Sequence, residues 1–399
     1  MGFSMIGNLS SGYVIGLTPE GSEVCHRMLN SDVLGEEIDN VDENLLRHLR
    51  IGGFFSNEAN PDQIYTAYFH ITQNCNLDCV GCYSFDSNRN ECEDTPYEII
   101  VRILDQLAAH GIRRLIFSGG EPFLREDLPQ ILEYAKKVCC FERIDIPTNG
   151  TCVTQEVLCQ IATNVDMISV SIDGYSENSI AYIRRNQRFN DLIRVIEMIR
   201  KTGIQVRILP TIHAMNYADI EKYQILADQL GVAIGFSLFY APPDYPEVKK
   251  LIPGEYELAE LSSIVCQTSK GGSVVFEDVP IAAALIARSS CGAGRGIISV
   301  SYDGQVYPCH MLHNEQFSMG SILEKDLDCI LAGAKRKAFL DSCAALPEEC
   351  LDCDLLYLCG SGCRARAMYA LGSIHSKDPY CSLIRAYYET YFERVLTKA

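Results

Sequence analysis

Between residues 65 and 240 the sequence alternates apolar stretches with amphipathic ones, and this alternation constrains the fold more than any other feature. Six stretches are typical of strands: 66–72, 113–118, 142–147, 167–172, 205–210 and 232–240. Helical patterns separate them at 98–110, 128–138, 154–162, 192–200 and 220–230. Such alternation predicts an α/β fold with a parallel sheet and right-handed crossovers. Six βα units are too few to close an eight-stranded barrel, so we expect a partial (β/α)6 barrel of the TIM-like type, open on one side.

Polar and sulfur-containing motifs follow four of the predicted strands. In such sheets the active site lies at the carboxyl ends of the strands, so we expect these motifs to converge on one rim. They are Cys75, Cys79 and Cys82 after the first strand, Gly119-Gly120-Glu121-Pro122 after the second, Thr148-Asn149-Gly150 after the third, and Ser171, Asp173 and Gly174 at the end of the fourth.

Ten of the nineteen cysteines fall into two spaced sets. The first is C-N-L-D-C-V-G-C at 75–82, and the second comprises Cys291, Cys309, Cys350, Cys353, Cys359, Cys363 and Cys381. Thiolates at such spacing bind zinc or iron–sulfur clusters. Three thiolates leave one iron of a cubane cluster without a protein ligand, which suits redox chemistry at that iron. A zinc knuckle at the first set, or a four-cysteine zinc ribbon at Cys350 to Cys381, is the structural alternative.

Composition narrows the classes of function. The formal net charge of −18 repels nucleic-acid phosphates, so we expect no nucleic-acid partner. No apolar run is long enough to cross a bilayer, and residues 1–12 lack the features of a secretory signal. Many cysteines without such a signal favour reduced thiols and bound metal over disulfides. We therefore expect a cytoplasmic protein without a membrane partner.

The chain divides into five predicted regions. These are an N-terminal extension at 1–65, the partial barrel at 66–240, a linker or bridging region at 241–290, a region with the late cysteines at 291–385, and a C-terminal helix at 386–399. The stretch 255–290 reads as mainly helical and carries no motif. In the late region, Y-D-G-Q-V-Y-P at 302–308 predicts a β-hairpin with an Asp-Gly turn.

The motifs together resemble the radical S-adenosylmethionine (radical SAM) enzymes of the SPASM subgroup. C-x3-C-x2-C after the first strand and Gly-Gly-Glu-Pro after the second are the radical SAM part. The SPASM pattern, C-x(9–15)-G-x4-C, then C-x2-C-x5-C-x3-C, then C, is matched from Cys291 through Gly304 to Cys381. The resemblance covers residues 66 to 385. It implies a radical SAM barrel followed by a C-terminal iron–sulfur SPASM domain.

The resemblance implies S-adenosyl-L-methionine and three [4Fe–4S] clusters, one radical SAM and two auxiliary. Cys75, Cys79 and Cys82 are the implied ligands of the first cluster. Cys291, Cys309 and Cys363 are implied for the inner auxiliary cluster, and Cys350, Cys353, Cys359 and Cys381 for the outer one. Some relatives have an eighth cysteine where this chain has Ile297. The fourth site of the inner cluster is therefore open, filled by solvent, or held by Cys329, Cys343 or His310. At an open iron we expect a substrate thiolate.

The resemblance also implies contacts to S-adenosylmethionine. Glu121 and the Gly119-Gly120 backbone are assigned to its ammonium. These residues belong to the Gly-Gly-Glu-Pro motif, which ends at Pro122 and is part of the cofactor site. Asn149 also belongs to the cofactor site. Ser171 and Asp173 are assigned to its ribose or carboxylate, and Arg184, or else Arg185, to its carboxylate.

Two positions depart from the family pattern. The residue before the third motif cysteine is usually aromatic, but here it is Gly81, and Tyr83 offers a nearby ring. Sulfatase-maturing members place an Asp base directly after the cysteine of D-G-x-x-Y-P-C, whereas this chain has His310, which is either a catalytic or a structural residue. This difference makes sulfatase maturation less favoured.

The resemblance favours an enzyme that modifies a ribosomally made precursor peptide. Reductive cleavage of S-adenosylmethionine yields a 5′-deoxyadenosyl radical, and the expected product is a Cys thioether or another oxidative cross-link. Dehydrogenation or carbon–carbon bond formation on a protein or small molecule is the second hypothesis, and an iron–sulfur electron-transfer protein the third. We expect a flavodoxin or ferredoxin as reductant. Residues 1–65 are a candidate shortened winged-helix domain that binds a leader peptide by strand addition.

Overall fold

A mixed sheet forms the centre of the computed structural model, which describes residues 4–30, 42–55, 63–85, 89–242, 245–268, 276–281 and 285–396. The predicted parallel strands are β3 (Thr66–Thr72), β4 (Arg114–Gly119), β5 (Arg143–Thr148), β6 (Met167–Ile172) and β7 (Gln205–Ile212), followed by β8 (Ala233–Ile234) and β9 (Ser237–Leu238). Strands β3 to β8 pair in parallel in the order of the sequence, and β9 also pairs in parallel with β7. The partial α/β barrel expected from the sequence is confirmed.

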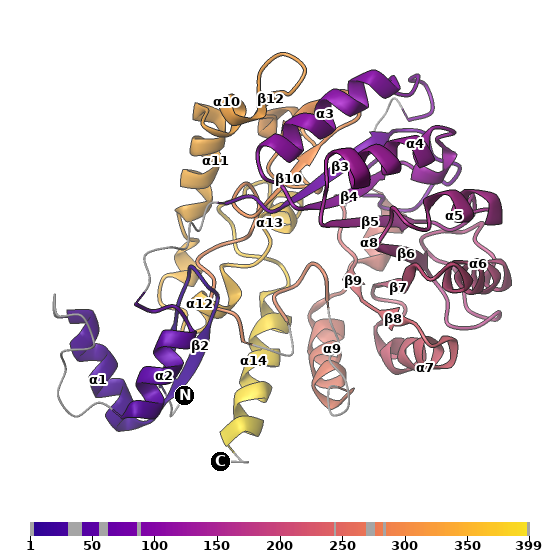
Figure 1. Ribbon diagram of the computed structural model, residues 1–399. Coiled ribbons are helices and arrows are strands. Elements are labelled where there is room, and N and C mark those ends of the chain that lie inside the picture. The colour runs from indigo at the N-terminus through magenta and orange to yellow at the C-terminus, as the bar shows by residue number, and fades with distance from the viewer. Residues whose placement is uncertain are drawn as a thin grey trace.

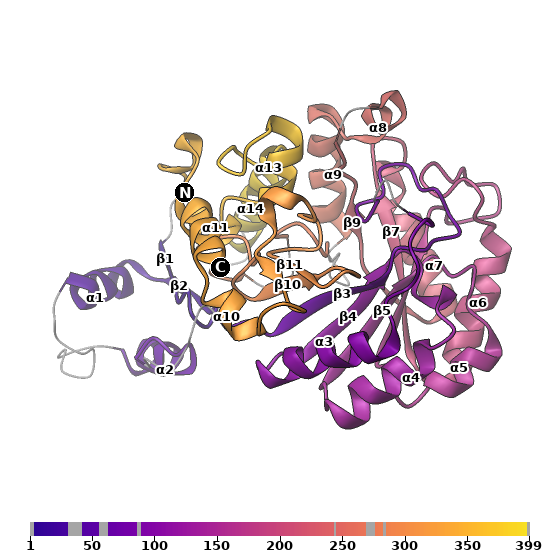
Figure 2. The same ribbon diagram turned by 90° about the horizontal axis from the view of Figure 1, so that it is seen from above.

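The helices between these strands cover the outer face of the sheet, as Figure 2 shows. They are α3 (Tyr97–Ala109), α4 (Leu128–Glu133), α5 (Gln155–Ile161), α6 (Phe189–Thr202) and α7 (Ile220–Leu230). Each turns an apolar stripe toward the strands, and the buried residues of strands and helices form one continuous apolar cluster. A five-residue π-helix (Tyr134–Val138) continues α4, and short 3₁₀ turns stand at Pro122–Leu124 and Tyr217–Asp219.

The sixth predicted strand, 232–240, is interrupted at Gly235. Its first piece, β8, pairs with Arg207 and Ile208 of β7, and its second piece, β9, pairs with Thr211 and Ile212. At the break Phe236 forms a bridge to Phe276, and the Glu277 N–H donates to the Phe236 carbonyl at 2.8 Å. Residues 276–281 therefore lie beside this edge of the sheet, in an extended segment and not in a helix.

The late-cysteine region continues the same sheet. Strand β10 (Ile297–Val300) pairs in parallel with β3, and β11 (Gln305–Tyr307) and β12 (Gly320–Ser321) add to it in antiparallel fashion. The predicted hairpin is confirmed, with its turn at Gly304, whose φ is +80°. The helices of this region are α10 (Leu327–Leu331), α11 (Ala334–Ala344), α12 (Leu356–Cys359), α13 (Arg364–Leu371) and α14 (Cys381–Leu396), with 3₁₀ turns at Glu315–Phe317 and Glu348–Cys350.

Helices α8 (Pro246–Leu251) and α9 (Glu255–Thr268) connect the barrel to the late region, and α9 packs beside α14 (Figure 1). A second apolar cluster fills the space between them. The prediction that 255–290 is mainly helical is right for α9, but the described residues 276–281 and 285–290 are not helical. Within the described residues, no helix is both long and apolar enough to cross a membrane.

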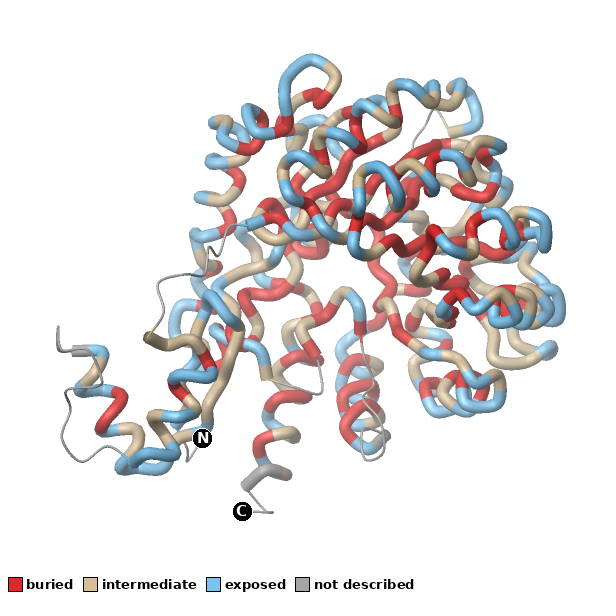
Figure 3. The backbone as a smooth tube through the Cα atoms, in the orientation of Figure 1, coloured by how far each residue is buried: buried red, intermediate tan, exposed pale blue. Residues whose placement is uncertain are grey.

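The N-terminal unit is a small hairpin with two helices and lies apart from the barrel helices (Figure 1). Strand β1 (Ser4–Gly7) pairs antiparallel with β2 (Val14–Leu17), and α1 (Pro19–Asn30) and α2 (Glu43–Ile51) follow. Both strands are half-buried at most, in contrast to the buried barrel strands (Figure 3). The unit contacts the rest of the chain through Met5 and Val14, which pack against the second apolar cluster, and through the Ala287 N–H, which donates to the Gly12 carbonyl at 2.8 Å.

Candidate active site

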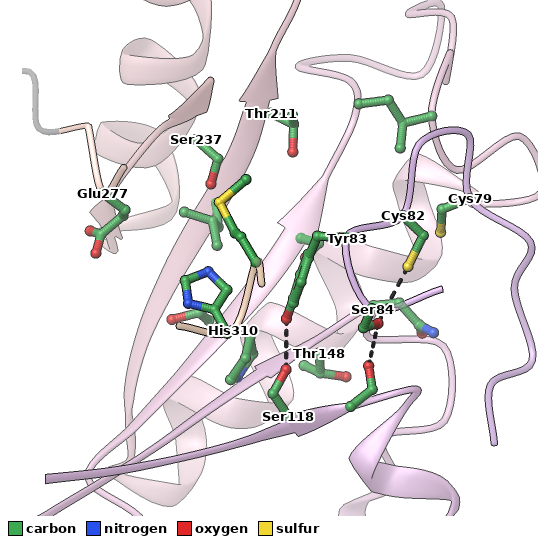
Figure 4. Close-up of a pocket in the computed structure, with 18 of the residues that line it drawn as sticks. Cys79, Cys82, Tyr83, Ser84, Ser118, Thr148, Thr211, Ser237, Glu277 and His310 are labelled. Carbon is green, nitrogen blue, oxygen red and sulfur yellow. Dashed lines mark hydrogen bonds between the residues drawn. The ribbon is translucent and has the colours of Figure 1, made fainter. Parts of the chain in front are cut away.

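One cavity of about 260 Å³ opens at the carboxyl ends of the barrel strands. The three early cysteines, Cys75, Cys79 and Cys82, all line it. Figure 4 shows Cys79 and Cys82 at one side of the cavity and His310 across from them. Burial, together with negative charge on Cys82 and Cys75, raises the pKa of the Cys79 thiol to about 12 against the opposing effect of Arg184, so the three sulfurs lie within electrostatic reach of each other. A bound cation would remove this repulsion.

The Gly-Gly-Glu-Pro turn is fitted against the loop that carries the cysteines. A Cβ atom on Gly120 would lie 2.0 Å from the Asn74 carbonyl oxygen, and one on Gly119, whose φ is +124°, would lie 2.2 Å from the Thr72 carbonyl oxygen. The Gly120 and Glu121 N–H groups donate to these two carbonyls at 2.8 Å. Only glycine permits this approach, so the two motifs expected to share a site are in direct contact.

Glu121 lines the cavity and also joins two of its loops. Its buried carboxylate accepts hydrogen bonds from the Thr148 hydroxyl at 2.7 Å, the Asn149 N–H at 2.8 Å and the Phe123 N–H at 3.2 Å. Burial raises the pKa of Glu121, and these three donors oppose the rise. Pro122 begins the buried 3₁₀ turn behind Glu121 and does not line the cavity.

Arg184 lines the cavity, whereas Arg185 is exposed on the surface. One Arg184 guanidinium nitrogen donates to Asp173 at 2.5 Å, and the Ile183 and Arg184 N–H groups donate to the other Asp173 oxygen. Asp173 is buried and does not line the cavity, and its carboxylate positions Arg184. Ser171 and Asn149 both line the cavity.

Phe239 occupies the space that an aromatic residue before Cys82 would need. Gly81 has a φ of +67°, and a Cβ there would lie 2.5 Å from the Phe239 ring. Phe239 is buried and lines the cavity beside Val80 and Gly81. The aromatic ring thus comes from the end of β9, which the sequence pattern around Cys82 does not reveal.

His310 lies across the cavity from the early cysteines and packs against the rings of two tyrosines. Its ring stacks on Tyr68 with 4.1 Å between centroids and stands edge-on to Tyr83 at 5.3 Å. The Tyr83 hydroxyl is 2.7 Å from the Ser118 hydroxyl (Figure 4). Burial, and to a smaller extent the neighbouring His313, lower the pKa of His310 to about 3, so its imidazole is neutral.

The late cysteines gather in two places. Burial and the charges of neighbouring thiols raise the pKa values of Cys350, Cys359 and Cys381. Cys353 is one of these neighbours, and an Arg385 nitrogen lies 3.2 Å from its sulfur. Cys291, Cys309 and Cys363 pack on a third apolar cluster, where burial and mutual repulsion raise the pKa values of Cys309 and Cys363.

Of the two spare cysteines, Cys343 belongs to that third cluster and Cys329 does not. Cys343 is buried on α11, and its pKa is raised to about 12 by burial and by the charge on Cys291. Cys329 is exposed.

The cysteine sets offer thiolates, which are the ligands that iron–sulfur clusters take. Within the described residues, no group of three or more His, Cys, Asp or Glu side chains is arranged to hold one metal ion. A cubane cluster presents its irons at separate corners, so its thiolates stand farther apart than the ligands of one zinc ion.

Several cavity residues escaped the sequence analysis. Ion pairs join Arg114 to Asp145 and Arg207 to Glu277, and Asp278 lines the cavity beside Glu277. Arg89 donates to the Ser84 carbonyl at 2.7 Å and lies 3.5 Å from the Cys82 sulfur. Alternate residues of a strand point to the same face of a sheet, so the strand pattern could have identified Arg114, Asp145 and Arg207 as cavity residues. Glu277 and Asp278 lie in a segment with no periodic pattern.

The sequence profile of the radical SAM superfamily matches residues 69–227, from β3 into α7. The chain belongs to the radical SAM superfamily. A second profile, the SPASM iron–sulfur cluster-binding domain, matches residues 291–354, so this radical SAM enzyme also carries a SPASM domain. Both were expected from the cysteine spacing and are confirmed.

Curated relatives of this radical SAM enzyme include a heme synthase, a peptide maturase and a peptide cyclase. The AdoMet-dependent heme synthase of Methanosarcina barkeri is 28% identical over 342 residues, covering 78% of this chain and 95% of the relative. The mycofactocin maturase MftC of Mycobacterium tuberculosis is 25% identical over 330 residues, covering 78% and 81%. The PqqA peptide cyclase of Gluconobacter oxydans is 26% identical over 327 residues, covering 78% and 89%.

Solved structures share the fold. The structure of anSMEcpe with bound AdoMet has a TM-score of 0.69 and 18% identity, covering 83% of this chain and 94% of that one. Streptococcus suis SuiB bound to the precursor peptide SuiA has a TM-score of 0.64 and 17% identity, covering 88% and 84%.

Proposed function

We propose that this radical SAM enzyme matures a ribosomally made precursor peptide by forming a Cys thioether or another oxidative cross-link. The observation that carries the proposal is the single cavity that reaches from Cys75, Cys79 and Cys82 to His310, next to Cys309. A substrate held there lies between a site for radical generation and a site that can accept an electron. The maturases and cyclases among the relatives support a peptide as the substrate.

The first cluster is assigned to Cys75, Cys79 and Cys82, with S-adenosylmethionine at its open iron. When bound, these groups would supply the radical chemistry that removes a hydrogen atom from the substrate. The chain orients the cofactor: the Gly119-Gly120 backbone and Glu121 face its ammonium. Arg184, positioned by Asp173, binds its carboxylate, and a guanidinium suits this because it can donate two parallel hydrogen bonds. Asn149, Ser171 and the rings of Phe239 and Tyr83 complete the site.

Two auxiliary clusters are assigned to the late cysteines. The outer one takes Cys350, Cys353, Cys359 and Cys381. The inner one takes Cys291, Cys309 and Cys363, and the burial of Cys343 beside Cys291 supports it as the fourth ligand over the exposed Cys329. Three cubanes correspond to roughly twelve iron atoms per chain. A substrate thiolate at the inner cluster is the competing assignment, and its paramagnetic resonance signal would then change with a Cys-containing peptide and not with its Cys→Ser form.

Co-expression with a short, cysteine-rich reading frame encoded beside the gene tests the proposed function. Mass spectrometry of the recovered peptide should show a loss of two hydrogens for each cross-link. The variant with Ala at Cys75, Cys79 and Cys82 should form neither product nor 5′-deoxyadenosine. If that variant still forms 5′-deoxyadenosine, the assignment of the radical site is wrong. We expect a flavodoxin or ferredoxin to supply the electron.

A second candidate function is oxidative chemistry on a small molecule. The AdoMet-dependent heme synthase and the Fe-coproporphyrin III synthase of Methanosarcina barkeri support it, since they match 78% and 84% of this chain. Incubation of the reconstituted enzyme with iron–coproporphyrin III distinguishes the two: conversion of the porphyrin together with an unmodified peptide would favour this candidate.

A further inference from the structure

Four carboxylates line the cavity, and they differ in how well they are paired. Glu121 accepts three hydrogen bonds, Asp145 accepts from Arg114 and Arg143, and Glu277 pairs with Arg207. Asp278 is held more loosely than these three, because its ion-pair partner Arg366 lies 3.6 Å from one of its oxygens, beyond hydrogen-bond distance. Burial of a carboxylate that has no closely bound cation favours its neutral form and raises its pKa.

The surroundings of Asp278 explain why its charge is poorly compensated. The Leu238 N–H lies 3.1 and 3.2 Å from its two oxygens, and the backbone N–H of Asp278 itself also stabilises the charged carboxylate. Arg366 approaches one oxygen at 3.6 Å only, because its guanidinium is committed to Asp378 and to the Asp278 carbonyl. The other titratable neighbours, Asp378 and the buried Tyr380, supply no positive charge.

Ionisation of Asp278 agrees with this geometry. Burial raises its pKa to about 6, with the charge of Asp378 adding to the rise and Arg366 opposing it. The side chain keeps 20% of its surface exposed, on the cavity side. At neutral pH it is therefore a charged base that faces the substrate space. His310, which follows Cys309, is stacked on Tyr68 and is a much weaker base.

We propose that the Asp278 carboxylate accepts the proton that the substrate releases when its radical is oxidised. This rests on the proposed function and adds the base that the chemistry needs. In a thioether-forming step, the carbon radical bonds to a cysteine sulfur, the S–H bond breaks, the proton passes to Asp278, and the remaining electron passes to an oxidised auxiliary iron–sulfur cluster. Atoms and charge then balance, and the proton leaves to solvent when the carboxyl ionises again.

The test uses the reconstituted enzyme with its precursor peptide and compares Asp278→Asn with the native chain. A general base contributes about 10²- to 10⁴-fold to a rate, so cross-linked product should form at least about a hundredfold more slowly. Formation of 5′-deoxyadenosine should continue, because Asp278 lies outside the residues assigned to the cofactor. Cross-linking at the native rate would overturn the proposal, whereas loss of 5′-deoxyadenosine as well would show a structural role.

Two further measurements separate a base from a merely structural residue. In the native enzyme, product per 5′-deoxyadenosine should fall as the pH drops through about 6, because the carboxyl then carries a proton, and Asp278→Asn should show no such step. Infrared difference spectra should show the carboxyl protonating near that pH in the native chain only. A native profile that is flat through pH 6, or an infrared band that persists in Asp278→Asn, would contradict the assignment.

Glu277→Gln is the matched control, since Glu277 lies in the same segment and lines the same cavity but is paired with Arg207. It should keep the native ratio of product to 5′-deoxyadenosine. Added acetate should restore cross-linking by the Asp278→Gly variant, because a free carboxylate can replace the missing base. Acetate would not restore activity lost through a structural defect. If the native enzyme modifies no peptide, the proposed function is wrong, and the role of Asp278 is not what failed. If the native enzyme and Asp278→Asn modify the peptide equally, only the role of Asp278 as the base is wrong.

Discussion

Residues near the early cysteines combine binding with loop positioning, and Glu121 is the clearest case. The sequence motif points to its role toward the cofactor, but it does not reveal that the carboxylate joins the turn after β4 to the turn after β5 through Thr148 and Asn149. That contact depends on tertiary packing. The same reason explains why Phe239 was missed, because no local pattern at Gly81 indicates which distant ring fills the space.

Glu121→Ala should lower the affinity for S-adenosylmethionine by roughly ten- to a hundredfold, because a hydrogen bond to a charged group contributes about 1.5–3 kcal/mol. Iron content should stay unchanged, since the carboxylate is not a thiolate ligand. Equilibrium dialysis with labelled cofactor measures the affinity, and an iron assay measures the iron content. An unchanged affinity would remove Glu121 from the cofactor site.

Phe239→Leu should weaken S-adenosylmethionine binding by roughly two- to tenfold, because ring stacking is worth about 0.5–1.5 kcal/mol beyond the buried area. Tyr256→Leu on the exposed face of α9 is the control and should bind as the native chain does. Equal affinities for Phe239→Leu and the control would mean that Phe239 only fills space.

Elements with a regular pattern were the predictable part of this fold. The parallel strands β3 to β7 and helices α3 to α7 lie where periodicity indicated them, within a few residues. The pairing of β10 with β3 was not predicted, because strand pairs far apart in sequence leave no local signal. The split of the sixth strand at Gly235 was also missed, although it brings residues 276–281 to the cavity.

Gly235→Val should disturb that segment selectively. A Cβ at Gly235 would lie 2.8 Å from a Glu277 carboxylate oxygen and 3.4 Å from Arg207. We expect product per 5′-deoxyadenosine to fall by about tenfold or more, since a base must be within hydrogen-bond reach of its proton, while cofactor affinity is retained. Gly296→Ala, where a Cβ meets nothing within 4 Å, is the control. Loss of cofactor binding would show a wider distortion than the one expected.

At the scale of the whole molecule, the N-terminal unit is the part least attached to the barrel. Its strands are half-buried at most, and we keep the proposal that it binds a leader peptide. Deletion of residues 1–55 should leave iron content and S-adenosylmethionine cleavage unchanged but weaken binding of the precursor peptide. Fluorescence anisotropy of a labelled precursor measures this. Equal affinity in the truncated and full-length chains would remove the unit from substrate recognition.

The pairing of β10 with β3 makes one sheet carry both groups of cysteine loops. The early loop leaves the carboxyl end of β3, and Cys309 follows the hairpin that begins with β10. Strands, and not a flexible linker, therefore set the separation between the two proposed cluster sites. Electron tunnelling depends steeply on distance, so this sheet acts as a spacer of fixed length. New substrates can then evolve through changes in loops and cavity side chains without altering how fast electrons cross the molecule.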